Sequence, residues 1–567
     1  MTMKLCESWI YSTAVFGVAV AGLLAGTMFA VWNGFVETEL LPKRYSLVVA
    51  TALLAIVLAC QRVVRFKMGL ATGAVCCVMA YFVVRTFLSP LEQPVIVWVS
   101  VAALLLLYVC FNAMPQRWDV ILEGLVILVC VAQGIYGILQ YAGLVPPRST
   151  FPVVGCFDNP AGFAACLAAG FPFCLKKLPK GKCWQWGLVM CGRVVIPVAI
   201  VMSGSRAGML SIVLVSAVCL YDKYSRIRKP LIATAIFVAG VLLLAAMFFL
   251  KTGSSLGRLQ IWEASIAMVG EHPLFGGGAG LFLANYMPHQ AAFFAADPSK
   301  GWPLLADNVA HPFNEYLLIL IEYGIAGLSL LLFAAFVMLR NRRWSTTQGL
   351  CLLAIGVFAC FSYPLRYPFV WVVIAYAMAT IGTGRCVTMV TDWKMRTTAI
   401  GMIILICGLS FYDSKFELKW GNAVRTWNIG NPEASLEIYR QLYSRWNGNP
   451  FFLYNYGRVL GAFGRHCDSN RILTRCCKYL NDYDVQMAIG DNYRHIGESD
   501  KACQCYHTAS LMCPNRFLPL YRLMTFYAES GQVLMARAKA QQILKMPVKI
   551  PSPRISQIQE EAKQLVL

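Results

Sequence analysis

The chain has 567 residues, of which 58% are hydrophobic and 14% are charged, and its mean hydropathy is +0.59. A water-soluble domain is less apolar and more highly charged than this chain. The composition therefore excludes an ordinary soluble globule and indicates a protein that crosses a membrane many times. The formal net charge of +21 would suit nucleic-acid binding, but the distribution of the basic residues argues against that class.

Long apolar runs predict thirteen membrane-spanning helices, because lipid requires every backbone polar group to be satisfied within its own segment. The predicted spans are 9–32, 45–61, 68–85, 93–113, 119–142, 159–175, 184–203, 207–221, 230–250, 313–339, 348–363, 368–384 and 397–412. The first run is too long for a cleavable signal and further spans follow it. The predicted fold is therefore all-α, a polytopic helical membrane protein.

The basic residues cluster after the even-numbered spans. The clusters occupy residues 62–67, 176–182, 223–229, 340–343 and 385–396. Positively charged connections stay on the cytoplasmic side, so the N-terminus is predicted to be cytoplasmic and the region after the thirteenth span to lie outside. The long connection 251–312 is predicted to lie outside as well.

The region after the last predicted span is polar and weakly periodic. Gly464, Gly497 and Gly531 recur at spacings of 33 and 34 residues, and Ala434, Ala502 and Ala536 recur at 68 and 34. This period resembles tetratricopeptide repeats, which stack helix pairs into a solenoid. We therefore predict a membrane domain over 1–413 and a helical-repeat domain over 414–567. The repeats could dock a protein partner or acceptor, or could pack on the membrane domain and steady its loops.

The chain has 22 cysteines, and most lie within or near the apolar runs, where they behave as small hydrophobes. Six follow the last predicted span: Cys467, Cys476, Cys477, Cys503, Cys505 and Cys513. Disulfides among these six and unpaired thiols are both compatible with the sequence. The cysteines show no spacing typical of a zinc site.

The connection 251–312 carries most of the residues that could do chemistry. It is predicted to be a long structureless loop, and such loops usually bind or react with something. Arg206 and Arg258 lie near the outer ends of predicted spans, where an arginine is costly without a partner or a wet cavity. Two guanidinium groups suit a diphosphate. His311, at the start of the next span, could accept a proton from a hydroxyl.

Two further features of this region have several interpretations. Glu315 and Glu322 follow His311 at i+4 and i+11 on one helical face, so either could orient the imidazole or line a wet seam. The triplet 276–278 is three glycines, which could let the backbone approach a phosphate or a sugar, but a flexible hinge is the favoured prediction. It is not a Walker loop, because no Gly-Lys-Ser/Thr sequence follows it.

Six segments in this part of the chain, taken in order, resemble the O-antigen ligase and polymerase superfamily. They are Cys156-Phe157-Asp158-Asn159-Pro160-Ala161-Gly162-Phe163, Ser203–Gly208, Gly257–Trp262, His272–Gly278, His311–Leu317 and Glu322–Gly327. The resemblance covers about 150–340, extends to the first five spans by topology alone and does not include the tail.

This resemblance implies an inverting, metal-independent glycosyltransferase without a cofactor, on the outer face of the bacterial inner membrane. Its donor would be a glycan on undecaprenyl diphosphate, and its acceptor lipid A-core, another glycan or a protein hydroxyl. Arg206 and Arg258 would hold the diphosphate, and His311 would be the base. Further residues that lie in the matching segments are predicted to bind substrate: Asn159, Ser205, Asn314, Glu315 and Glu322.

Three classes of function remain open. Within the glycan transferases, transfer of a whole block to an acceptor is favoured over polymerisation, because the repeat tail could position a bulky acceptor. A transporter is less favoured because the spans are poor in charges. A non-enzymatic scaffold for glycan assembly is the third possibility. Membrane lipids are expected partners, and nucleic acid is not.

Overall fold

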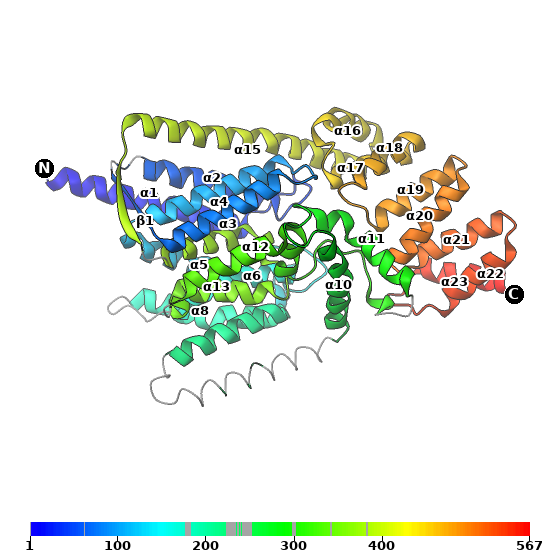
Figure 1. Cartoon of the computed structure of the whole chain (residues 1–567), viewed down its shortest axis with the longest axis horizontal. Helices are drawn as coiled ribbons and strands as arrows, with labels where there is room; N and C mark the ends of the chain where they lie inside the picture. The colour runs from blue at the N-terminus through cyan, green and yellow to red at the C-terminus, as the bar shows by residue number, and fades with distance from the viewer. Residues whose placement is uncertain are drawn as a thin grey trace.

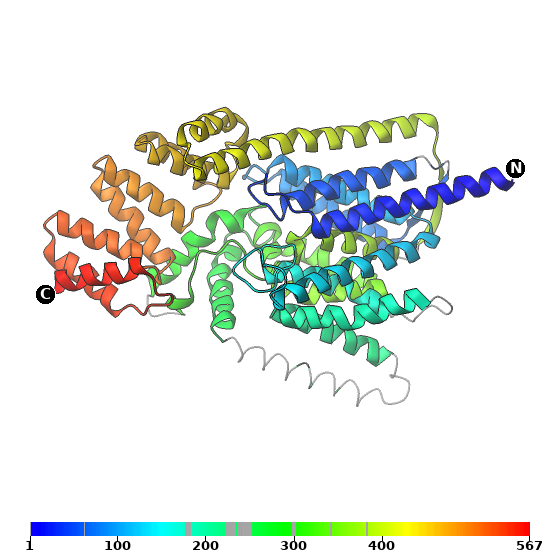
Figure 2. The ribbon, with the colours of Figure 1, turned by 180° about the vertical axis from the view of Figure 1, so that it is seen from behind.

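The computed structural model describes residues 2–59, 61, 63–175, 183–222, 252–297, 302–340, 343–381 and 384–567, with three isolated residues between 222 and 252. The apolar helices form a bundle, and the repeat helices extend from one end of it (Figure 1). The view from behind shows the same order of parts, with the two chain termini at opposite ends (Figure 2).

Seven described helices are long and apolar enough to span a membrane. They are α2 (Leu41–Ala59), α3 (Leu70–Phe87), α4 (Val95–Ala113), α5 (Asp119–Tyr141), α8 (Cys183–Met202), α12 (Glu315–Leu339) and α15 (Trp393–Asn428). Shorter apolar segments lie in α1 (Thr2–Phe29), α6 (Pro160–Gly170) with α7 (Pro172–Leu175), α13 (Thr347–Ala359) and α14 (Pro368–Ile381). The chain is thus an all-α polytopic membrane protein, as predicted.

Eleven of the thirteen predicted spans coincide with these segments. The predicted span 207–221 is helical over the described residues 206–222 and is not among the seven. The predicted span 230–250 lies outside the described residues.

One small sheet was not predicted. Strand β1 (Val63–Met68) pairs antiparallel with β2 (Arg385–Val390), in a register that runs from Val63 opposite Val390 to Met68 opposite Arg385. Both strands belong to the basic connections that follow predicted spans. The valine, threonine and phenylalanine residues of these strands favour a two-stranded ribbon once the two connections meet at one end of the bundle.

The predicted domain boundary at residue 414 falls inside a continuous helix. Helix α15 has 36 residues and runs along the bundle into the repeat region without a linker (Figure 1). The repeat helices follow in order: α16 (Pro432–Trp446), α17 (Pro450–Ala462), α18 (His466–Cys476), α19 (Tyr483–His495), α20 (Ser499–Met512), α21 (Phe517–Glu529), α22 (Val533–Lys545) and α23 (Pro553–Val566).

The periodic glycines mark the turns between paired helices of this tail. Gly464, Gly497 and Gly531 have φ values of 71°, 80° and 74°, and Gly430, one period earlier, has 85°. A left-handed residue ends a helix at little cost only when it lacks a Cβ. The structure therefore contains helical pairs at the spacing that the glycines predicted. All six tail cysteines are free, so the disulfide alternative is wrong.

The connection 251–312 is folded, contrary to the prediction of a structureless loop. It contains α10 (Thr252–Glu271), α11 (Leu281–Ala296) and a short 3-10 turn, η2 (Pro303–Leu305). Residues from α10 to α12 share an apolar core with the repeat helices, which includes Met268 and Met287 on one side and Tyr506 and Met512 on the other. Packing against the tail supplies the buried surface that a polar loop of this length lacks by itself.

The glycine triplet is a packed turn and not a flexible hinge. Helix α12 is broken at Gly324, where φ is 70° and ψ is −174°. The carbonyls of Ile321 and Glu322 accept hydrogen bonds from Gly277 and Gly278, at 3.0 and 2.9 Å. On the other side of the break, the N–H groups of Ile325 and Ala326 donate to the carbonyls of Pro273 and Leu274, at 2.9 and 3.0 Å. The segment 273–278 therefore replaces the hydrogen bonds that the helix loses.

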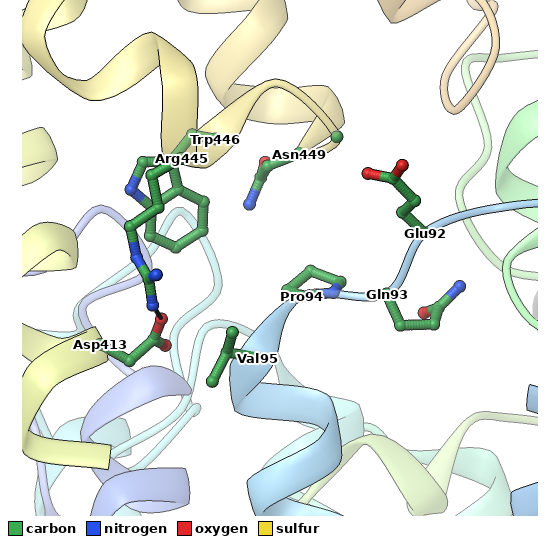
Figure 3. Close-up of a pocket in the computed structure, with 9 residues that line it drawn as sticks. Glu92, Gln93, Pro94, Val95, Asp413, Arg445, Trp446 and Asn449 are labelled. Atoms are coloured by element: carbon green, nitrogen blue, oxygen red, sulfur yellow. Dashed lines mark hydrogen bonds and ion pairs between the residues drawn. The ribbon is translucent and has the colours of Figure 1, made fainter. Parts of the chain in front are cut away.

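A second contact joins α15 and α16 to the membrane bundle. Asp413 is only 2% exposed and forms an ion pair of 3.0 Å with Arg445, while the Tyr45 hydroxyl donates to its other oxygen at 3.1 Å. Beside this pair is a hollow of about 100 Å³, lined also by Glu92 and Asn449 (Figure 3). The start of α4 thus lies against the first repeat helices.

Candidate active site

The two predicted arginines lie near each other over the first two turns of α10. Arg206 begins the helix over 206–222, and its guanidinium donates to the hydroxyls of Ser255 and Ser254, at 2.6 and 2.9 Å. Arg258 lies one turn further along α10, on the same face as these serines. Burial, followed by the positive charge of Arg206, lowers the pKa of Arg258 to about 10. An anion placed beside both guanidinium groups would relieve this repulsion.

Ser205 precedes Arg206 and serves the backbone. Its hydroxyl accepts from the N–H of Gly208 at 3.4 Å, in the manner of an N-cap. Gly204, with φ of 67°, turns the chain sharply between α8 and the next helix. This turn directs Arg206 toward α10, so the predicted substrate-binding residue Ser205 has a positioning role in this structure.

His311 lies between an arginine and an aromatic ring. Its Nε2 is 3.2 Å from Nη1 of Arg366, and its ring stacks on Tyr363 with centroids 4.9 Å apart. A guanidinium can only donate, so Nε2 accepts this hydrogen bond and the ring is neutral, with its proton on Nδ1. Burial, followed by the charge of Arg366, lowers the pKa of His311 to about 4.

Aromatic side chains connect the histidine to the arginine pair. The guanidinium of Arg258 lies 5.4 Å from the ring centre of Phe313, which in turn is 5.6 Å from Tyr363. Phe313 has a φ of 54°, the only positive value at a non-glycine residue in the described chain. Trp262 holds the same segment by donating to the Pro312 carbonyl at 2.8 Å. Such backbone strain is typical of functional sites, where the surroundings enforce it.

Asn159 supports Tyr363 from another element. Its Oδ1 accepts from the N–H groups of Ala161 and Gly162, which caps α6. Its Nδ2 donates to the Tyr363 hydroxyl at 2.9 Å. Asn159 was predicted to bind substrate. The structure places it next to His311 in the site, linked through Tyr363.

Three other predicted substrate-binding residues bind the backbone. Asn314 caps α12 by accepting from Tyr316 and Leu317. Glu315 accepts from the N–H of Leu365 at 3.0 Å, and Glu322 accepts from that of Gly280 at 2.9 Å. Among the described contacts, neither Glu315 nor Glu322 orients the imidazole of His311, because each carboxylate accepts a hydrogen bond from the backbone of a neighbouring turn. Glu322 fixes the start of α11, and Glu315 fixes the turn that carries Arg366.

Sequence reasoning missed Arg366. This residue ends the 3-10 turn η4 (Pro364–Arg366) between α13 and α14. Burial opposes its charge, but the carboxylates of Glu37 and Asp158 outweigh that effect and raise its pKa. The signal was present in the sequence: an arginine between two apolar runs needs a partner or a wet cavity. The same reasoning had singled out Arg206.

The geometry therefore defines a class of site: cationic side chains and a neutral imidazole gathered at one end of a helical membrane bundle. Residues 192–332 match the model of the O-antigen ligase family. That range includes Arg206, Arg258 and His311, and it includes the break in α12 at Gly324. This segment of the membrane bundle is therefore similar to the O-antigen ligase family, which is the family that the sequence motifs resembled.

No curated protein matches the chain. Among solved structures, one match is the crystal structure of the APC/C hetero-tetramer Cut9–Hcn1, at 10% identity and a TM-score of 0.24, over 92% of this chain and 86% of that one. So low a score does not establish a shared fold.

Proposed function

We propose that this protein is a glycan transferase whose donor is a glycan on undecaprenyl diphosphate. The observation that carries the proposal is the pairing of Arg206 with Arg258 over the first two turns of α10, close to the aromatic cluster that holds His311. Charge-assisted bonds from two guanidinium groups suit the oxygens of a diphosphate. The O-antigen ligase domain supports the same class of substrate.

The reaction balances without an added cofactor. Nε2 of His311 takes the proton of the acceptor hydroxyl, and the oxygen attacks the anomeric carbon of the donor sugar from the opposite face. The bond from that carbon to the diphosphate oxygen breaks, and its electron pair stays on the diphosphate. Arg206 and Arg258 stabilise this charge, each worth roughly 3 kcal/mol if well placed. General base catalysis by His311 would contribute about 10²–10⁴-fold.

The proposed location is the bacterial inner membrane, with the N-terminus in the cytoplasm and the repeats in the periplasm. The periplasm holds no ATP, so a donor activated by its own diphosphate fits that side. We favour transfer of a complete glycan to lipid A-core, another glycan or a protein over repeat-unit polymerisation. The contact between the tail and residues 252–312 supports a tail that steadies the site, beside any role in binding an acceptor or partner.

The test is reconstitution of the full chain with labelled undecaprenyl diphosphate glycan and candidate acceptors. We expect Arg206→Ala and His311→Ala to abolish transfer, while the proteins insert and unfold like the wild type. Arg385→Ala in the exposed strand β2 and His289→Ala, whose ring bonds to Glu271, are matched controls that should keep activity. Full transfer by the His311 variant would remove this residue from the mechanism.

Products distinguish the alternatives. Polymerisation would yield acceptors with many repeat units and, in inactive variants, acceptors with one. A transporter would move solute into vesicles without any transfer product. A scaffold would leave glycan display unchanged in all of these variants.

A further inference from the structure

The imidazole of His311 cannot act as a base in the arrangement that the structure shows. A neutral imidazole has one nitrogen with a free electron pair. Here that nitrogen is Nε2, and it already accepts a hydrogen bond from Arg366 at 3.2 Å. An acceptor hydroxyl would have to displace the guanidinium before its proton could be transferred. The proposed base is therefore capped.

The same contact makes the base weak. With a pKa of about 4, caused by burial and by Arg366, the imidazole would hold a proton poorly near neutral pH, where an efficient general base has a pKa close to the ambient pH. Removing a neighbouring cation raises the pKa of a histidine, and bringing an anion near raises it further. A donor diphosphate would draw the Arg366 cation away from His311 and would bring negative charge near the ring.

The surroundings of Arg366 allow the side chain to change partners while its backbone stays in place. The preceding residue is held on both sides, since the N–H of Leu365 donates to Glu315 and its carbonyl accepts from Trp371. The side chain of Arg366, in contrast, interacts with charges on other elements. Glu37 and Asp158 attract it, and Arg44 repels it.

The remaining groups around this pair are neutral or cationic. The phenols of Tyr363 and Tyr367 come from the segment around η4, and Arg258 approaches Tyr363 from α10. Among the described residues, no carboxylate forms a hydrogen bond or an ion pair with His311. An incoming diphosphate would thus introduce the missing negative charge on the side of the arginine pair.

We propose that Arg366 is a positioning residue that caps Nε2 of His311 until the diphosphate of the donor draws the guanidinium away. This inference rests on the proposed function and adds an order to it: the donor binds first, and only then can the base accept a proton from the acceptor. A histidine that accepts a proton before the donor has bound has no sugar to transfer. The cap therefore makes proton transfer to His311 depend on the bound donor.

The test is histidine NMR on the full-length protein in lipid nanodiscs, with ¹³C and ¹⁵N in the imidazole rings. The chain has six histidines, so the signal of His311 can be assigned by its loss in His311→Gln. In the donor-free wild type we expect a neutral ring with the proton on Nδ1. Arg366→Gln should raise the pKa of His311 by at least about one unit, and Arg366→Lys, which keeps the charge, should raise it less.

Geranyl diphosphate is the probe for the donor. Added to the wild type, it should move the His311 signals toward those of Arg366→Gln and raise the pKa, while it should change Arg366→Gln itself far less. Arg385→Gln, at the other end of the bundle, is the control and should behave as the wild type.

The outcomes separate the two proposals. If geranyl diphosphate binds, as seen in its ³¹P signal, but leaves His311 unchanged, the cap is wrong and the proposed function stands. An identical pKa in Arg366→Gln and the wild type also overturns the cap. If the probe fails to bind wild type, and Arg206→Gln and Arg258→Gln behave no differently, the proposed donor site is wrong.

Discussion

At the scale of single residues, the histidine and the arginines obtain their chemistry from their neighbours. His311 is predicted to couple stability to pH. Its pKa is lowered from 6.5 to about 4 in the folded chain, so the unfolded state binds a proton at a higher pH than the folded state. The sign follows from linkage: the folded state loses stability as the pH falls from about 6.5 toward 4.

Thermal unfolding of the purified protein at several pH values measures this effect. We expect the wild type to lose more stability between pH 7 and 5 than His311→Gln does. Equal slopes for the two proteins would show that His311 does not titrate as described.

Arg258 should depend on the shape of its side chain as well as on its charge. Arg258→Gln removes a donor for the leaving diphosphate, so transfer should fall by about 10²–10³-fold. Arg258→Lys keeps the charge without the planar fork and should lose less. Steady-state transfer rates over a range of donor concentrations measure both variants. If Arg258→Lys transfers as slowly as Arg258→Gln, the planar geometry of the guanidinium and not its charge determines the transfer rate.

At the scale of elements, the break in α12 fixes the helix that follows the segment 302–313, which contains His311. A Cβ at Gly324 would collide with the carbonyl of Leu274, and the residue also has a positive φ. Gly324→Ala should therefore cost at least about 1–3 kcal/mol of backbone strain. Unfolding in detergent measures the loss.

A matched control for this variant is Gly401→Ala in α15, where a Cβ meets nothing within 4 Å. That substitution should be neutral or slightly stabilising, because alanine favours helix more than glycine does. If Gly324→Ala were as stable as Gly401→Ala, the packed crossing of 273–278 over the break would not exist in the membrane.

At the scale of the whole molecule, polar contacts join the repeat tail to the segment 302–313, which contains His311. These contacts lie next to the apolar core that α10 to α12 share with the repeat helices. Asp307 forms an ion pair of 2.6 Å with Arg516 of the α20–α21 turn, and Asn308 donates to Asp482 at 2.9 Å. Both partners of the ion pair are nearly half exposed, so the pair is worth up to about 1 kcal/mol.

Charge reversal tests whether this contact steadies the segment. Arg516→Glu should increase hydrogen exchange of residues 302–313 up to about fivefold, because it places a second carboxylate beside Asp307. Adding Asp307→Arg should restore the wild-type exchange. If the double variant exchanges as fast as the single one, the ion pair does not hold the segment.

The local patterns of the sequence determined a large part of this molecule. Apolar runs predicted most of the described spans, and glycines at one period predicted the helical pairs of the tail. Motifs around Arg206, Arg258 and His311 indicated the family whose model matches residues 192–332. These features are readable because they follow from the composition and spacing of neighbouring residues, which restrict the backbone directly.

Only the tertiary structure decided how these parts meet. The glycine triplet fills the break in α12, the 251–312 connection folds against the tail, and Glu315 and Glu322 serve backbone groups. Arg366 and His311 lie 55 residues apart in the chain. No local pattern encodes such a contact, because it depends on how separate helices pack and on which buried charges find partners there.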